Sequence, residues 1–408
     1  MSSLHLRRVG RWCSEDGEKE DMSYRKYTNQ EFKKLDNDAQ INIMALFGNG
    51  VDIQLMSYLN SPYRTSYQNF YNYLCYKNFS KDNIIFQKMT RDKKENENNP
   101  DIKQNWSDFE SSLIDIFNDG NHIDVKKLSN DFNQFQVEFS NFLNDIITPN
   151  MLAQLGRDSS ERSLALSSFE NFLADLDKNN FKKLRFPSKV DDHKLFNWEI
   201  LNFNYTSMLD NILVLDKEQY DPHFWKHSDS QIYFAARPEK YENDYKSWHR
   251  NTYFHSYLMT NITHPHGYQN VPKSMLFGFD NENQITNVDN RNKAKNFLKP
   301  YWAQNDKKYK SYFNNTDLFI LYGLSLGDSD FWWWNNILNS LLETDSELII
   351  YNYNINNESD SDTINRFINV ATKEKLDNGK LYKLHQKIAI VQYNSKTKLN
   401  AFKLDNLD

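Results

Sequence analysis

The chain has few of the residues that stabilise small secreted proteins or bind structural zinc. It holds two cysteines in 408 residues, Cys13 and Cys75. Two thiols are too few for a four-cysteine zinc site, and they do not suggest a disulfide framework. Long apolar runs are also missing. No stretch approaches the length of a membrane span, and the first 21 residues have no apolar segment of signal-peptide length. We therefore expect a soluble cytoplasmic protein without membrane contact.

The chain also lacks a surplus of positive charge. Its formal net charge is -6, whereas a general nucleic-acid binder usually carries a basic surplus that pairs with phosphates. We therefore expect no general nucleic-acid binding, although a local basic patch stays open.

Composition and periodicity divide the chain into three parts. Residues 1–40 are polar and without period, which predicts an N-terminal extension or a partner-contacting arm. Residues 81–194 read as a helical insertion, with a charged linker at 91–100 and a helix capped by Ser107 or Asp108. Aromatic and aliphatic residues spaced by three or four predict one buried helix face, formed by Phe132, Phe135, Phe139, Phe142 and Ile146.

Continuous apolar runs predict strands that are covered on both faces. They occupy 41–47, 199–205, 274–279, 317–326, 347–353 and 387–393. Because helical stretches alternate with these runs, we predict an α/β fold with a doubly wound, mostly parallel, Rossmann-like sheet. Residues 41–80 and 195–408 would together form a discontinuous nucleotide-binding domain.

The first strand ends in GNGVD, which contains Gly48, Asn49, Gly50 and Asp52. Where a strand enters a helix through small residues, backbone N–H groups can face an anion, and glycines admit a diphosphate closely. In that interpretation Gly50→Val would block dinucleotide binding and leave the fold largely intact. The alternative interpretation is a tight turn without a ligand.

The second candidate block is NFNYT, residues 202–206, at the end of another predicted strand. The Asn204 side chain has a donor and an acceptor, so it could hold a ribose hydroxyl or a water. Alternatively, Asn204 satisfies a turn. The third block is HPHG, in which His264 or His266 could serve as a general base near neutral pH. A plain turn is again the alternative. No carboxylate or cysteine cluster accompanies the two histidines, so we expect no metal.

The fourth block is YGLSLGDSD, residues 322–330. Ser325 and the backbone amides of this loop could contact ribose or phosphate, while Asp328 or Asp330 could cap the following helix. The three tryptophans at 332–334 most simply pack that helix.

The order of the four blocks resembles that of Sir2-like nicotinamide-dinucleotide-binding proteins. The residues within the blocks resemble more closely those of the AbiH-like family of bacterial phage-defence proteins, in which a GNG-x-D start precedes a T-S-Y-x-x-F stretch. Here that stretch is Thr65, Ser66, Tyr67 and Phe70. The resemblance covers roughly residues 41 to 340. Val51 stands where the family usually has Phe, and Leu324 where it usually has His. The four-cysteine zinc module of protein deacylases is missing, which disfavours a lysine deacylase.

The resemblance implies an abortive-infection protein that binds NAD and hydrolyses its nicotinamide–ribose bond without a metal. Asn204 and His266 would be catalytic, and His264 would matter much less. The residues that would contact NAD are Gly48, Asn49, Gly50, Asp52, Tyr205, Gly267, Gly323, Ser325 and Asp328. The alternative is a sensor that binds NAD or ADP-ribose without turnover, as a homo-oligomer or with a defence-complex partner. A nuclease is disfavoured because no carboxylate-rich metal motif is present.

Overall fold

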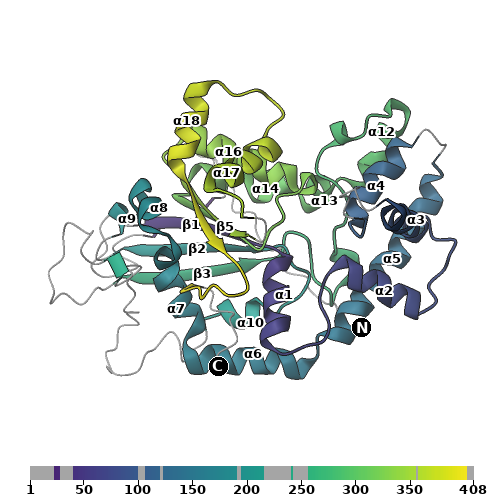
Figure 1. Cartoon of the computed structure of the whole chain (residues 1–408), viewed down its shortest axis with the longest axis horizontal. Helices are drawn as coiled ribbons and strands as arrows, with labels where there is room; N and C mark the ends of the chain where they lie inside the picture. The colour runs from purple at the N-terminus through teal and green to yellow at the C-terminus, as the bar shows by residue number, and fades with distance from the viewer. Residues whose placement is uncertain are drawn as a thin grey trace, which may run out of the picture.

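A six-stranded parallel sheet forms the centre of the molecule (Figure 1). The computed structural model describes residues 23–27, 40–99, 106–119, 123–190, 194–215, 240–241, 256–354 and 357–401. The strands are β1 (Gln40–Phe47), β2 (Leu195–Asn202), β3 (Tyr257–Thr263), β4 (Leu318–Tyr322), β5 (Glu347–Tyr353) and β6 (Ile388–Tyr393). Their order is β3-β2-β1-β4-β5-β6, and every neighbouring pair is parallel.

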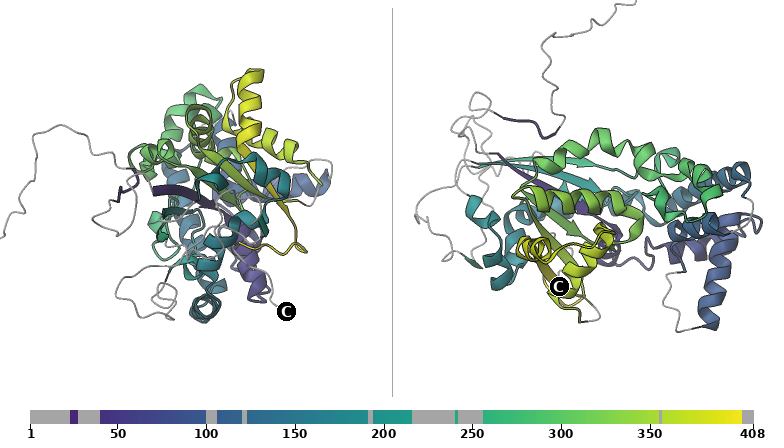
Figure 2. Two further views of the ribbon diagram at one scale, coloured as in Figure 1. Left: turned by 90° about the vertical axis from the view of Figure 1, so that its left-hand side faces the viewer. Right: turned by 90° about the horizontal axis from the view of Figure 1, so that it is seen from above.

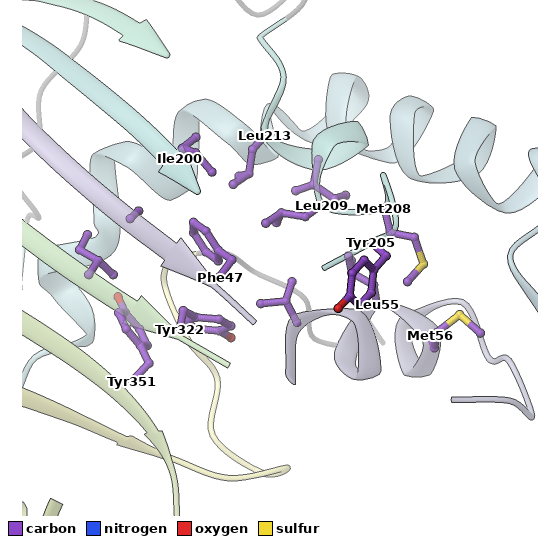
Figure 3. Close-up of a cluster of buried hydrophobic side chains, with 14 of the residues drawn as sticks. Phe47, Leu55, Met56, Ile200, Tyr205, Met208, Leu209, Leu213, Tyr322 and Tyr351 are labelled. Carbon is purple, nitrogen blue, oxygen red and sulfur yellow. The ribbon is translucent and has the colours of Figure 1, made fainter. Parts of the chain in front are cut away.

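Both faces of the sheet are covered, because successive strand residues point to opposite sides. Ile43, Ala45 and Phe47 of β1 face one hydrophobic core, whereas Met44 and Leu46 face a second. Figure 1 shows α16, α17 and α18 over one face and α1, α6, α7 and α10 over the other. Figure 3 shows the first core near the ends of the strands. The predicted doubly wound α/β fold is thus confirmed.

One predicted strand is wrong and one strand was missed. Residues 274–279 form no strand among the described residues and make only an isolated bridge, from Phe279 to Leu298. Gly278 has a φ of +144°, outside the strand region, and Phe277 packs against Phe109 of the helical region. The missed strand, β3, lies at the edge of the sheet, and most of its residues are partly exposed. It therefore lacks a continuous apolar run.

One group of helices lies between β1 and β2 in the sequence. They are α1 (Asn49–Tyr58), α2 (Tyr67–Tyr76), α3 (Ile84–Asn98), α4 (Phe109–Asn118), α5 (Val125–Ile146), α6 (Pro149–Arg162), α7 (Leu164–Asn171), η1 (Phe172–Asp175), α8 (Lys178–Lys183) and α9 (Phe186–Lys189). The expected linker at 91–100 is wrong, because α3 continues to Asn98. Within this charged helix Asp92 is buried, and its carboxylate pairs with the Nζ of Lys88 at 2.6 Å. Asp108, rather than Ser107, caps α4.

The remaining helices follow β2, β3, β4 and β5. They are α10 (Asp210–Leu213), η3 (Pro272–Ser274), η4 (Glu282–Gln284), α12 (Val288–Ala294), η5 (Lys295–Phe297), α13 (Lys299–Ala303), α14 (Asn305–Lys308), α15 (Lys310–Asn314), η6 (Asp328–Asp330), α16 (Phe331–Glu343), α17 (Asp360–Ala371) and α18 (Asn378–Lys387). No helix in the described parts of the chain is long and apolar enough to cross a membrane.

Helices α2 to α5 and residues 272–297 form a helical lobe at one end of the sheet (Figure 2). The phenylalanine face of α5 is its centre, as predicted. Phe139 is 2% exposed and contacts Phe70 of α2, with ring centroids 4.8 Å apart. It also contacts Tyr205, which follows β2, at 5.5 Å. The lobe therefore lies against the carboxyl ends of the strands.

The same hydrophobic core contains lobe and sheet residues. Phe169 of α7, also within 81–194, lies 4.6 Å from the ring of Trp198 on β2. The division into an insertion and a discontinuous domain stays a prediction. Of the expected N-terminal extension, only 23–27 and the first strand residue are described. Within it Tyr24 is buried, and its hydroxyl lies 3.1 Å from that of Thr316.

Phe139→Ala should lower the free energy of unfolding by about 3–5 kcal/mol, because the truncation leaves a cavity among the surrounding rings. Val137→Ala is the matched control. It lies on the same helix but is 47% exposed, so its effect should stay within about 0.5 kcal/mol. Denaturant unfolding measures both, and equal midpoints would show that the phenylalanine face is not part of the core.

Candidate functional site

Two of the predicted loops meet in the middle of the sheet. From β1 the chain proceeds through β2 and β3 to one side, and from β4 through β5 and β6 to the other. Phe47 at the end of β1 pairs with Tyr322 at the end of β4. Ligands of open α/β sheets bind outside the carboxyl ends of the strands at such a switch point. The loops that begin at Gly48 and Gly323 lie there.

The glycines of these loops allow direct backbone contact between them. The Gly48 amide donates to the Tyr322 carbonyl, and the Gly50 amide to the Gly323 carbonyl, each at 2.9 Å. A Cβ on Gly50 would lie 2.7 Å from the Gly323 Cα, and Gly323 has a φ of +67°. The sequence analysis placed a diphosphate beside Gly50. The structure corrects this prediction, because the loop after β4 fills that space and its Gly323 carbonyl accepts the hydrogen bond of the Gly50 amide.

Asn204 joins the loop after β2 to the loop after β1. Its side-chain Nδ2 donates to the Gly48 carbonyl at 3.2 Å, and the residue is 4% exposed. Since a carbonyl oxygen only accepts, the amide is oriented with Nδ2 toward Gly48. Oδ1 points elsewhere and has no hydrogen-bond partner among the described residues. The sequence left open whether Asn204 holds a ligand or only satisfies a turn. This geometry leaves the Oδ1 acceptor available to a ligand.

Asp52 lies beneath this loop. Thr206 donates to its Oδ2 at 2.7 Å, while its Oδ1 is buried without a partner among the described residues. The pKa of Asp52 is raised to about 8, chiefly by burial; the hydrogen bond from Thr206 opposes this shift, and the nearby charge of Asp210 adds to it. Asp52 therefore stabilises the Asn204 loop from below. The sequence analysis predicted that Asp52 contacts NAD, whereas the structure buries its carboxylate against Thr206.

The T-S-Y-x-x-F stretch is fixed to the first loop. The Thr65 hydroxyl donates to the side chain of the exposed Asn49 at 2.7 Å. Ser66 caps α2 by accepting from the Asn69 amide at 3.3 Å. The stretch thus orients Asn49 and starts the helical lobe.

His264 and His266 have different surroundings. His264 contacts the Asn204 carbonyl through Nδ1 at 2.9 Å and the Asp210 carboxylate through Nε2 at 2.9 Å. His266 is buried, with its ring 4.8 Å from that of Phe203 and its Nε2 3.6 Å from Asp330. The four predicted blocks therefore meet at the carboxyl ends of β1 to β4.

A family model described as bacteriophage abortive infection AbiH matches residues 44–353. The chain belongs to the AbiH family. Its role is therefore in phage abortive infection. No curated protein matches the sequence.

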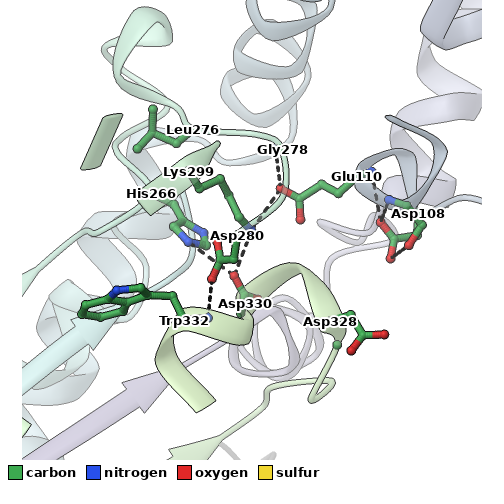
Figure 4. A network of polar contacts seen from close by, with 12 residues as sticks. Asp108, Glu110, His266, Leu276, Gly278, Asp280, Lys299, Asp328, Asp330 and Trp332 are labelled. Atoms are coloured by element: carbon green, nitrogen blue, oxygen red, sulfur yellow. Dashed lines mark hydrogen bonds and ion pairs between the residues drawn. The ribbon is translucent and has the colours of Figure 1, made fainter. Parts of the chain in front are cut away.

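The matched range of this AbiH-family protein includes a buried charged cluster that the sequence did not predict (Figure 4). We call Glu110, Asp280, Lys299 and Asp330 the lysine cluster. Lys299 is 2% exposed, and its Nζ lies 2.8 Å from Asp330 and 3.5 Å from Glu110. Burial raises the pKa of Glu110 to about 7, and the charge of Lys299 opposes this shift. The cluster joins α4 of the lobe to the start of α16.

The cluster also contributes to the charge state of His266. The pKa of His266 is lowered to about 3, chiefly by burial and next by the positive charge of Lys299, while Asp330 opposes both. The expectation that His266 titrates near pH 7 is wrong, because a buried imidazole beside an ammonium stays neutral. His266 can accept a proton at pH 7, although it is a weak base.

The expected helix caps are also corrected. Neither Asp328 nor Asp330 caps the helix after β4 with its side chain. Exposed Asp328 instead pairs with Lys373 at 2.9 Å. The amide of Trp332 donates to Asp280 at 3.0 Å, so the capping carboxylate comes from a distant segment. As predicted, the three tryptophans pack this helix: Trp333 and Trp334 are buried, and Trp332 packs partly buried against the same core.

The remaining candidates lie around the same loops. Tyr205 is buried and donates to the Leu276 carbonyl at 3.0 Å, and Gly267 has a φ of +88°. Ser325 is exposed at the outer edge of the loop after β4. Leu324, where the family usually has His, packs partly buried against the second core. The described residues contain no group of three or more side chains suited to hold a metal ion.

Gly50→Ala should destabilise the protein by about 1–3 kcal/mol, because the added Cβ would overlap the backbone of Gly323. Gly156→Ala is the control. It lies inside α6, where an added Cβ would meet nothing nearer than 3.8 Å, and it should stabilise by up to about 1 kcal/mol. Thermal and denaturant unfolding distinguish the two signs. A neutral Gly50→Ala would remove the backbone contact as the reason for glycine.

His266→Gln should change how stability depends on pH. Since folding lowers the pKa of His266 from 6.5 to about 3, its contribution is complete above pH 6.5 and is lost as pH falls. The parent should therefore lose stability relative to the variant by up to about 1.4 kcal/mol per pH unit below 6.5. Denaturant unfolding of both chains at pH 7.5 and 5 measures this. A difference independent of pH would contradict a buried neutral His266.

Proposed function

We propose that this abortive-infection protein binds NAD at the carboxyl ends of β1 and β4 and hydrolyses the nicotinamide–ribose bond. The observation that carries the proposal is that Asn204 joins the loops after β1, β2 and β3, while the loop after β4 contacts the loop after β1. The Asn204 Nδ2 donates to the Gly48 carbonyl, and its Oδ1, which has no partner among the described residues, would accept from a ribose hydroxyl or a water. The strand order supports binding at this point, because the sheet has its switch point there.

The reaction needs few catalytic groups. The C1′–N bond breaks, its electron pair goes to the pyridinium nitrogen, and nicotinamide leaves as a neutral molecule. Water adds to C1′ and loses a proton, which gives ADP-ribose. Asn204 would orient the water or the ribose hydroxyls, so that part of the rate gain comes from positioning.

His266 would take the proton of the attacking water. Its imidazole is neutral at pH 7 and is therefore able to accept a proton. It is a weak base, but bond breaking precedes proton loss in an oxocarbenium-like transition state, so a strong base is unnecessary. In this proposal exposed Asn49, Ser325 and Asp328 form the outer edge of the site.

The burial of His266 also favours a second candidate function. A base with a pKa of about 3, held beside Lys299, suits a pocket that binds NAD or ADP-ribose without turnover. Such a sensor would control assembly with a partner or a second copy of the chain. Turnover distinguishes the two functions.

Purified protein incubated with NAD should release nicotinamide, which chromatography detects. Asn204→Ala should lower the turnover number by about 100-fold, because the reacting groups lose their orientation. Asn141→Ala is the control, since Asn141 is exposed on α5 and away from the strand ends.

Calorimetric titration with NAD completes the test. NAD binding without nicotinamide release by the parent would replace the hydrolase with the sensor. Neither binding nor release, or an Asn204→Ala variant as active as the parent, would contradict the proposed site.

A further inference from the structure

A closed ring of hydrogen bonds surrounds the backbone of Asn204. The Asn204 amide donates to Oδ1 of Asn202 at 3.1 Å, and Nδ2 of Asn202 donates to Asp210 at 2.9 Å. Asp210 contacts Nε2 of His264 at 2.9 Å, and Nδ1 of His264 returns to the Asn204 carbonyl at 2.9 Å. The ring starts and ends on the same residue, so both backbone polar groups of Asn204 are held.

The members of this ring come from three elements and are mostly buried. Asn202 ends β2, Asp210 begins α10 and His264 follows β3. Asn202 and the His264 side chain are 0% exposed, whereas the Asp210 side chain is 23% exposed. The His264 ring also packs on Tyr268, with ring centroids 3.9 Å apart. Buried networks with satisfied partners hold one conformation firmly.

We infer that His264 is a positioning residue for Asn204. The Asn204 carbonyl can only accept, so Nδ1 of His264 carries a hydrogen and donates it. The other ring nitrogen is held by Asp210, and the imidazole cannot turn away without losing both contacts. The consequence is that the backbone of Asn204 is fixed and its side chain is presented at the switch point. This role differs from the minor one that the sequence implied for His264.

The lysine cluster has no part in this arrangement, because it lies around His266. Asp210 contacts His264, whereas Asp330 contacts Lys299 and lies near His266. The two histidines therefore act through separate carboxylates. The inference rests on the proposed function only where it links the position of Asn204 to turnover of NAD.

Two substitutions separate the two contacts of His264. In His264→Asn the side-chain Nδ2 stands at the position of the imidazole Nδ1, so it keeps a donor for the Asn204 carbonyl and loses Asp210. In His264→Gln the side-chain Nε2 reaches toward Asp210, but the donor for the Asn204 carbonyl is lost. His264→Asn removes more volume than His264→Gln, so a general loss of packing should lower the melting temperature of His264→Asn more.

Hydrogen–deuterium exchange of the peptide that contains 202–206 tests the ring independently of any activity. Exchange should become about tenfold faster in His264→Gln and stay near the parent rate in His264→Asn. If His264→Gln does not fold, Asp210→Ala takes its place, because it removes the carboxylate that contacts Asn202 and His264, at a partly exposed position. Unchanged exchange in the variant that folds would overturn the inference.

Nicotinamide release from NAD then tests the link to turnover. His264→Gln should lower kcat by about tenfold or more with little change in KM, and His264→Asn should restore most of kcat. A kcat loss in His264→Asn equal to or larger than that in His264→Gln would overturn the positioning role, since the loss of packing would then account for it. If the parent releases no nicotinamide, the proposed function fails, and the exchange result alone decides the inference.

Discussion

The contact between the loops after β1 and β4 is the constraint on which the rest of the site depends. Two backbone hydrogen bonds of 2.9 Å join Gly48 to Tyr322 and Gly50 to Gly323. Only glycine fits at Gly48 and Gly50, because a Cβ there would lie within 2.7 Å of the opposite loop. This contact leaves the Gly48 carbonyl facing Asn204, so the loop after β2 is positioned by the same pair of loops.

Two buried networks extend from that centre and do different things. On one side, Asp210 and His264 fix the backbone of Asn204. On the other, Lys299 joins Glu110 of the helical lobe to Asp330 at the start of α16, and burial together with the Lys299 charge keeps His266 neutral. Buried ion pairs contribute little net stability, but removing one partner leaves an uncompensated charge. We therefore infer that the lysine cluster chiefly fixes the position of the lobe relative to α16.

Local sequence patterns predicted where most strands end, but they could not predict the contacts between distant segments. Gly48, Asn204 and Gly323 each follow an apolar run, so their place at one edge of a parallel sheet followed from the sequence. The sequence did not show why glycine is needed at positions 48 and 50, because the atoms that exclude a side chain belong to the loop after β4. Glu110 and Lys299 are separated by 189 residues, and no local motif marks either of them. Only the packing of the lobe against the sheet brings them together.

The central claim is that NAD binds at the switch point with its nicotinamide ribose beside Asn204. A crystal structure of the chain with a slowly hydrolysed NAD analogue tests it most directly. The account predicts a ribose hydroxyl within hydrogen-bond distance of the Asn204 Oδ1 and the diphosphate over the loops after β1 and β4. Density for the analogue elsewhere, for example in the cavity between α2 and α5 lined by Tyr73, Lys77 and Asp145, would contradict it.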